Sequence, residues 1–327
     1  MQKYAAKRIL YIFFVFFIIS IMMFLLFKAT PGDPVMQQLE GQQQRLTPTR
    51  FKELYDQTYV RLGLDKPLPV QYLRWMGRTL TGDFGRSLLY RKPVIEVVKI
   101  PMRNTILLNI LVMIAVFAIT IPLGITTAVK KGTVYDNSVQ VITILGYSLP
   151  TFIIALAAML LFSVTLGWLP LTGTSTAGLT GTSWQLFLDR LKHMILPTLV
   201  LTFSSLGSLT RYIRAAMIDA LRMDYIRTAR AKGLKEKVVI YSHAFRNSLI
   251  PFVTVLVSWM LSLFSGSIMI EKIFVWDGMG KLLVQAITNM DYGLAMAVEM
   301  FYVLLSLIGN LIVDIAYTMV DPRVRLS

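Results

Sequence analysis

The chain has 327 residues, of which 55% are hydrophobic and 16% are charged, and its mean hydropathy is +0.61. A soluble protein of this length needs more charge to cover its surface, so the composition indicates a polytopic membrane protein. The net charge of +15 is typical of basic loops beside anionic lipid, and we expect no nucleic-acid partner. The absence of cysteine excludes disulfides, thiolate metal sites and cysteine nucleophiles.

Six apolar segments along the chain predict an all-α fold with six transmembrane helices. The first segment, residues 9–27, is uncharged and follows three basic residues. It is longer than the apolar core of a signal peptide, so we expect a retained helix with its N-terminus inside. The fourth segment is short and rich in Ser, Thr and Gly, which favours close helix packing. The last five segments are 105–129, 139–166, 194–210, 251–270 and 295–320.

The basic residues predict how these helices are oriented. With the N-terminus inside, every inside segment contains clustered lysine or arginine, whereas the short outside segments are nearly balanced. The positive-inside rule therefore agrees with six spans and predicts that both termini are cytoplasmic. The expected inside segments are 1–8, 130–138, 211–250 and 321–327.

The segment between the first two spans, residues 30–104, is too polar for lipid and is predicted to form an external cap. Thr47 and Pro48 indicate the start of a helix, and Gly63 indicates its end. A second short helix is expected over 70–80, and a surface amphipathic helix over 276–290. We therefore divide the chain into an N-terminal helix (1–29), the cap (30–104) and a core domain with five spans (105–327). The predicted apolar side of the 70–80 helix consists of Val70, Leu73, Met76, Gly77 and Leu80.

The loop at 211–250 is the most basic part of the chain. A short helix is predicted near 224–232, with Tyr225, Ile226, Ala229 and Leu234 on its less polar side, and Gly233 is placed to end it in the left-handed conformation. A short surface helix between two spans suits docking into a groove of another protein. The alternative is a basic loop that is only solvated.

Motifs for catalysis are missing from the sequence. It contains no GxxxxGK[ST], HExxH or GxSxG motif and no carboxylate pair at metal spacing, and its two histidines lie in different predicted loops. GMGK at 278–281 is interpreted as a chance fragment. We therefore expect no enzyme activity, no catalytic or metal site and no cofactor in this chain. Two acids in or near the last span, Glu299 and Asp314, are either functional or, for Asp314, paired with a basic loop residue.

Small or polar residues inside apolar spans, and a proline that breaks a helix, can provide water-filled surface for a solute. Spans two to five are expected to line such a path, and interhelical hydrogen bonding is the alternative role. The candidate path residues are Ser148, Pro150, Ser204, Ser205 and Ser262.

The sequence resembles the B-type permease subunits of bacterial ABC importers for oligopeptides, dipeptides and nickel, and the resemblance extends over essentially the whole chain. The sequence departs from the family pattern at one place. The motif that generally couples such permeases to their ATPases begins with Glu-Ala-Ala, and here those positions are Arg227, Thr228 and Ala229. The matching motifs are ATPGDP (29–34), LGLDKPLPVQYLRW (62–75), GDFGRSL (82–88), DYIRTARAKGL (224–234), HAFRNSLIP (243–251), FVWDGMGKLL (274–283) and NLIVDIAYTMVDPRVR (310–325).

This resemblance implies a six-helix, type I importer-like permease in the bacterial inner or plasma membrane. It implies a second homologous permease, two ABC ATPase subunits that bind ATP and magnesium, and an extracytoplasmic substrate-binding protein. The implied substrate is a peptide, with nickel or another small solute as the alternative. From the residues alone, an ion-coupled secondary transporter is a further alternative. The implied ATPase-coupling residues are Asp224, Tyr225, Arg227, Thr228, Ala229, Arg230, Gly233 and Leu234.

Overall fold

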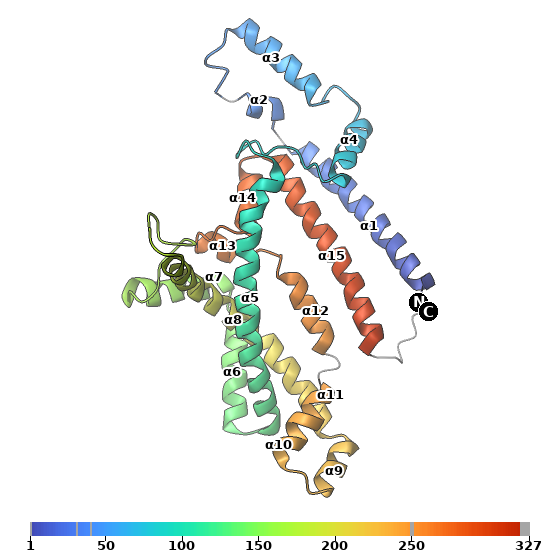
Figure 1. The fold of residues 1–327 in the computed structure, drawn as a ribbon, viewed down its shortest axis with the longest axis vertical. Helices are drawn as coiled ribbons and strands as arrows, with labels where there is room; N and C mark the ends of the chain where they lie inside the picture. Colours follow the sequence, from blue (N-terminus) through green and yellow to red (C-terminus); the bar gives the residue numbers. More distant parts are fainter. Residues whose placement is uncertain (1, 31, 40, 249–251, 321–327) are drawn as a thin grey trace. The chain divides into compact units, whose positions relative to one another are not determined.

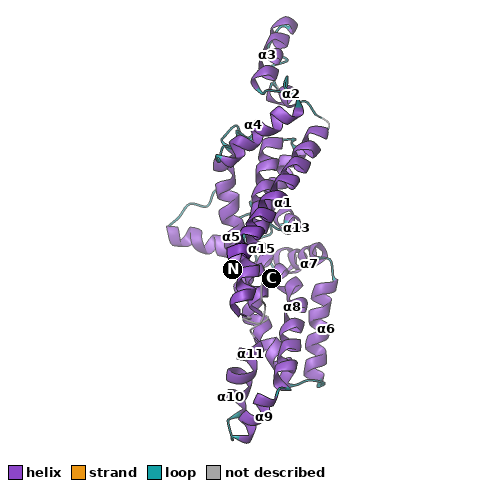
Figure 2. Cartoon of the chain, turned by 90° about the vertical axis from the view of Figure 1, so that its right-hand side faces the viewer, coloured by secondary structure: helices purple, strands orange, loops and turns teal. Residues whose placement is uncertain are grey.

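The computed structural model describes residues 2–30, 32–39, 41–248 and 252–320. Within these ranges the regular structure consists of helices (Figure 2) and one isolated antiparallel bridge between Arg86 and Pro93. Two segments, η1 and η2, have the wider turn of a π-helix. The helices are α1 Gln2–Ala29, α2 Pro34–Gln38, α3 Pro48–Arg61, α4 Leu68–Leu80, α5 Val94–Val129, α6 Val134–Ser148, α7 Thr151–Ala158, η1 Met159–Thr165, α8 Ser183–Leu221, α9 Asp224–Ala231, α10 Glu236–Val238, η2 Val239–Phe245, α11 Arg246–Ser248, α12 Phe252–Ser262, α13 Ile268–Ile273, α14 Met279–Thr288 and α15 Tyr292–Val320.

The chain divides into two compact units. Among the described residues, the core unit contains Met102–Lys281 and residues 308–320, and the cap unit contains Gln2–Pro101 and Leu282–Leu307. In the core unit, Figure 1 shows α9, α10 and α11 gathered at one end of α5, α6 and α8. The segment that carries the predicted coupling helix packs on α8 and shares a hydrophobic cluster with α5 and α8.

Four helices are long and apolar enough to cross a membrane: Leu10–Ala29, Val94–Val129, Ser183–Leu221 and Tyr292–Val313. They confirm helices at the first, second, fourth and sixth expected spans. Helices α6 and α7–η1 also pass this test together, but they are bent by 101°. The described residues therefore contain four spans, or five if the bent pair is one span.

The third and fifth expected spans are each interrupted in the structure and are not confirmed as single helices. The third breaks at Leu149, whose backbone is extended (φ −77°, ψ 136°) because the following Pro150 disfavours helical geometry there. The fifth ends at Ser262, and the next helix starts at Ile268. Helix α12, which the structure describes from Phe252 onward, has 11 residues. At 1.5 Å per residue they cover about 16 Å of a ~30 Å hydrocarbon core.

Helix α8 is longer than expected and contains the first part of the basic segment 211–250. It starts at a capping box formed by Thr182 and Gln185 and continues through Pro197 to Leu221. Residues 211–221 are therefore the end of a long helix and not a loop. This continuity connects the basic region directly to a membrane-spanning element.

In the cap unit, both predicted helix ends are confirmed. Thr47 precedes α3, which has Pro48 as its first residue. After α3, Gly63 has φ +72°. The Gly63 N–H donates to Val60 O (2.9 Å) and the Leu64 N–H to Tyr59 O (3.1 Å), which is the Schellman pattern.

The structure shows which sides of α4 and of the expected 276–290 helix are covered, and it contradicts the surface position expected for Trp276. Leu73 and Leu80 of α4 are 67% and 63% exposed, while Met76 and Thr79 are buried. Trp276, expected in a surface helix, is fully buried, and α14 begins only at Met279. Helical periodicity located the helices correctly, but it did not identify which side of α4 is covered by neighbouring helices.

Candidate coupling site

Helix α9 follows α8 after a two-residue turn and presents one side to the core. Ile226 is fully buried and Ala229 is 5% exposed. Both belong to one hydrophobic cluster with Met217 of α8 and with Val239 and Ala244 of η2. These contacts seat α9 on the end of α8. They confirm Ile226 and Ala229 as the predicted less polar side, whereas Tyr225 and Leu234, predicted on the same side, are 39% and 40% exposed.

The opposite side of α9 is free within the described chain. Asp224 and Arg227 have side chains that are 97% and 83% exposed, so their 3.8 Å ion pair contributes little to stability. We call this side the exposed face of α9. Its members are Asp224, Tyr225, Arg227, Thr228 and Arg230, with Leu234 exposed beyond the helix end.

Ala229 was expected to contact the groove of a partner, and the structure places it elsewhere. Its side chain packs on the chain's own cluster because it lies three residues after Ile226, on the same side of the helix. A larger side chain at Ala229 would therefore displace α9 from α8. Ala229 therefore seats α9 on the chain's own core, and the side chains of α9 that remain accessible are those of the exposed face.

Gly233 ends α9 as predicted. Its φ is +72°. The Gly233 N–H donates to Arg230 O (2.9 Å) and the Leu234 N–H to Ala229 O (3.4 Å), again in the Schellman pattern. A β-carbon built on Gly233 meets nothing within 4 Å, so the requirement for glycine here is the backbone conformation and not space.

An ion pair closes the turn after α9. Arg230 Nη2 donates to Glu236 Oε1 (2.6 Å) and Arg230 Nε to Glu236 Oε2 (3.2 Å). The hydrogen bond from Arg230 lowers the pKa of the Glu236 carboxyl. Both side chains are about half exposed, so the pair orders the turn more than it stabilises the fold.

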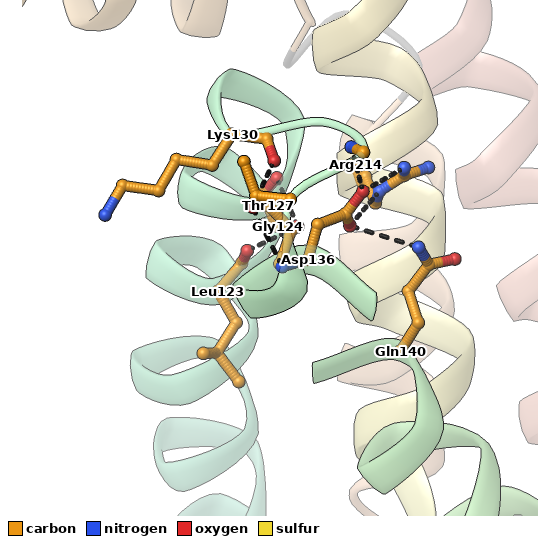
Figure 3. Close-up of polar contacts among 9 residues, drawn as sticks. Leu123, Gly124, Thr127, Lys130, Asp136, Gln140 and Arg214 are labelled. Atoms are coloured by element: carbon orange, nitrogen blue, oxygen red, sulfur yellow. Dashed lines mark hydrogen bonds and ion pairs between the residues drawn. The ribbon is translucent and has the colours of Figure 1, made fainter. Parts of the chain in front are cut away.

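A buried ion pair joins α8 to the start of α6 (Figure 3). Arg214 Nε donates to Asp136 Oδ1 (2.8 Å) and Arg214 Nη2 to Asp136 Oδ2 (2.7 Å). The Gly132 N–H (2.9 Å) and Gln140 Nε2 (3.1 Å) donate to the same carboxylate. Asp136 is 1% exposed. We call this arrangement the Arg214–Asp136 clamp; its bidentate geometry sets the two helices at one register.

Glycines bring the same helices into close backbone contact. A β-carbon on Gly146 of α6 would lie 2.5 Å from Phe203 O of α8, and one on Gly207 of α8 would overlap Thr143 O of α6. A β-carbon on Gly124 of α5 would also meet a side chain of α8. Close packing at small residues is a common way to join membrane helices. With the clamp, these contacts make α5, α6 and α8 one packed block.

The candidate path residues are distributed over α6, the bend, α8 and α12. Ser204, Ser205 and Ser262 each donate a hydrogen bond to a carbonyl of their own helix, at 3.0, 2.8 and 2.7 Å. Ser148 and Pro150 lie at the α6–α7 bend and are exposed. These bonds differ from the interhelical bonds considered as the alternative. A small pocket in the core unit contains none of the five; it is lined by Ile121, Tyr212, Ile213, Phe245, Ser248 and Phe252.

A buried carboxylate was missed by the sequence reasoning. Glu271 is 1% exposed. Its Oε1 accepts from Thr105 Oγ1 (2.9 Å) and its Oε2 from the Lys281 N–H (3.0 Å). A β-carbon on Gly278 would lie 2.5 Å from this carboxyl group, so the glycines of GMGK make room for Glu271. Burial raises the pKa of the Glu271 carboxyl, and the hydrogen bonds, which lower the pKa, offset only part of this rise.

The acids of the last span are only partly described. Glu299 lies half-buried in α15. The side chain of Asp314 and the whole of residues 321–327 lie outside the described residues. The Arg214–Asp136 clamp was also missed by the sequence reasoning. The local signal was an acid, Asp136, three residues after Thr133, a pattern that is typical of a helix start and here marks the start of α6.

Two family models match the chain. The binding-protein-dependent transport system inner membrane component matches residues 120–326, and the N-terminal model of such membrane components matches residues 1–93. The chain belongs to this family. It is therefore a multi-pass inner-membrane permease component, and the resemblance seen in its motifs is confirmed. The clamp and α9 both lie within the region matched by the first model.

Curated relatives of this permease component are similar over nearly their whole length. The oligopeptide transport system permease protein of Bacillus subtilis (strain 168) is 38% identical over 303 residues, which cover 92% of each chain. The di/tripeptide transport system permease protein of Pseudomonas aeruginosa (strain UCBPP-PA14) is 35% identical over 316 residues, again covering 92% of each chain.

Proposed function

We propose that this permease component takes up peptides as one subunit of an ATP-binding-cassette importer. The names of its relatives support a peptide substrate. The family description supports delivery by a substrate-binding protein. The sequence has no phosphate loop, so ATP hydrolysis belongs to partner subunits. A second, homologous permease would complete the path through the membrane.

The observation that best supports this proposal is that α9 is buried on one side and exposed on the other. One side, with Ile226 and Ala229, is buried on α8 and η2. The other side presents Tyr225, Arg227 and Thr228 to the surroundings. A force applied to the exposed face by an ATPase subunit reaches α8 through close-packed side chains, because packed interiors have low compressibility.

The Arg214–Asp136 clamp carries this movement onward. Arg214 lies in α8, ten residues before Asp224 begins α9, and holds the start of α6. Helix α6 ends at the 101° bend before Pro150. A displacement of α9 would therefore move α6 together with α8 and would change the geometry at the bend, where two of the candidate path residues lie.

The direct test places a bulky side chain on the exposed face. In cells that express the whole importer, Thr228→Trp should reduce uptake of a labelled peptide and uncouple it from ATP hydrolysis, without loss of the assembled complex. Lys131→Trp, in the exposed turn before α6, is the matched control and should transport normally. Normal uptake by Thr228→Trp would refute a docking role for α9.

The energy source and the substrate can be tested on the unmodified importer. Depletion of ATP with the ion gradient intact should stop peptide uptake. Continued uptake would support an ion-coupled secondary transporter instead. Unlabelled peptide should compete with the labelled substrate, whereas competition by nickel alone would assign the importer to a metal solute.

A further inference from the structure

Helix α4 lies against the membrane-spanning helix α1, although its sequence belongs to the polar segment expected outside the membrane. Tyr72 Oη is 2.8 Å from Ser20 Oγ. The ring of Phe24 contacts the rings of Tyr72 and Trp75, with centroids 5.6 and 5.8 Å apart. Met76 of α4 is buried in a cluster that includes Phe16 of α1. All these residues belong to the cap unit.

The contacted part of α1 is within its apolar span. The span runs from Leu10 to Ala29. At 1.5 Å per residue, Phe24 and Ser20 lie about 7 and 13 Å before the end of that span. The hydrocarbon core is about 30 Å thick, so both residues are at the depth of the acyl chains of one leaflet. A helix that packs on them cannot lie entirely in water.

The other sides of α4 match a membrane interface. Val70, Leu73 and Leu80 are exposed by 38%, 67% and 63%, and their spacing of three and seven residues places them on one side. Arg74 and Arg78 are exposed and one helical turn apart. Long basic side chains at this position reach lipid phosphates while their stems cover apolar surface.

We propose that α4 is an interfacial helix, with Val70, Leu73 and Leu80 inserted among the lipid acyl chains and with Arg74 and Arg78 at the phosphates. Lipid is favoured over a protein partner because α4 packs on a membrane-spanning helix whose exposed side chains at this level, Leu25 and Leu26, are also apolar. The helix would act as a collar that fixes how deeply α1 sits in the bilayer. This proposal holds for either orientation of the chain.

The test uses single cysteines, which the cysteine-free chain allows. A bimane label at Leu73→Cys or Leu80→Cys is compared with one at Val60→Cys in α3, an apolar site that is similarly exposed (60%) but lies in a mostly polar helix. The assembled importer is reconstituted in vesicles of phosphatidylethanolamine and phosphatidylglycerol. Quenching by lipids brominated in their acyl chains is measured beside quenching by aqueous iodide.

The labels at 73 and 80 should lose most of their fluorescence to brominated lipid and should be several-fold less sensitive to iodide than the label at 60. Iodide quenching at 73 and 80 equal to that at 60 would overturn the proposal and make α4 part of an aqueous cap. Protection from both quenchers would also overturn it, because a protein partner would then cover the patch. The two label positions guard against a local disturbance at either one.

Discussion

The Arg214–Asp136 clamp offers the sharpest test of how the core unit is held together. Arg214→Met removes both charged hydrogen bonds from Asp136 and leaves that carboxylate, 1% exposed, with only the Gly132 N–H and the Gln140 amide. Breaking one half of a buried ion pair is destabilising by about 3–5 kcal/mol. The Arg214 side chain is 18% exposed, so we expect the lower end of this range, roughly 3 kcal/mol.

The double variant Arg214→Met/Asp136→Leu separates stability from transmission. With both charges replaced by apolar groups, no buried charge lacks a partner, and stability should return to within about 1 kcal/mol of the original protein. Helices α6 and α8 would still touch at Gly146 and Gly207, but their register would no longer be set by a bidentate bond. Transported peptide per ATP hydrolysed should therefore remain low in the double variant.

The assay is unfolding of the purified importer in mixed detergent and sodium dodecyl sulfate micelles, measured beside peptide uptake and ATP hydrolysis. Arg214→Lys keeps the charge and loses the planar fork, and it should fall between the original protein and Arg214→Met in stability. An unchanged free energy of unfolding in Arg214→Met would show that Arg214 and Asp136 do not form a buried ion pair in the importer. Full coupling in the double variant would refute its role in transmission.

Three further predictions follow from the same geometry. Gly233→Val should lower stability by roughly 1 kcal/mol through backbone strain alone, because the site has space; uptake should fall while the complex still assembles, and unchanged uptake would dismiss the Schellman turn as a coupling element. Because its pKa is raised above the ordinary 4.5, Glu271 should stabilise the folded chain most below pH ~4.5 and progressively less as the pH rises through its folded pKa. Glu271→Gln should remove this dependence of the free energy of unfolding on pH, measured from unfolding curves at several pH values. An identical pH dependence in the variant would show that titration of Glu271 is not its cause. To test the orientation of the helices, Arg227→Cys should react with a membrane-impermeant thiol reagent only in opened cells, whereas Gly178→Cys should react in intact cells as well. Labelling of Arg227→Cys in intact cells would show that the orientation is the reverse of the one predicted.

The local features of this chain were determined by short stretches of sequence. Gly63 and Gly233 end their helices where predicted because a left-handed residue is a property of one backbone position. The start of α3 at Thr47 and Pro48 likewise needs no distant partner. Family membership could also be inferred, since the motifs that carry it are continuous runs of residues.

Tertiary structure alone decided which surfaces are covered and which distant residues meet. The clamp joins residues 78 positions apart, and Thr105 reaches Glu271 across 166 positions. Apolar periodicity could not show that Leu73 is exposed while Met76, on the same predicted side of α4, is buried, because an apolar side chain can face lipid or another helix equally well. Hydropathy measures transfer out of water, whereas packing is decided by shape and by the few polar groups that must find partners where water is absent.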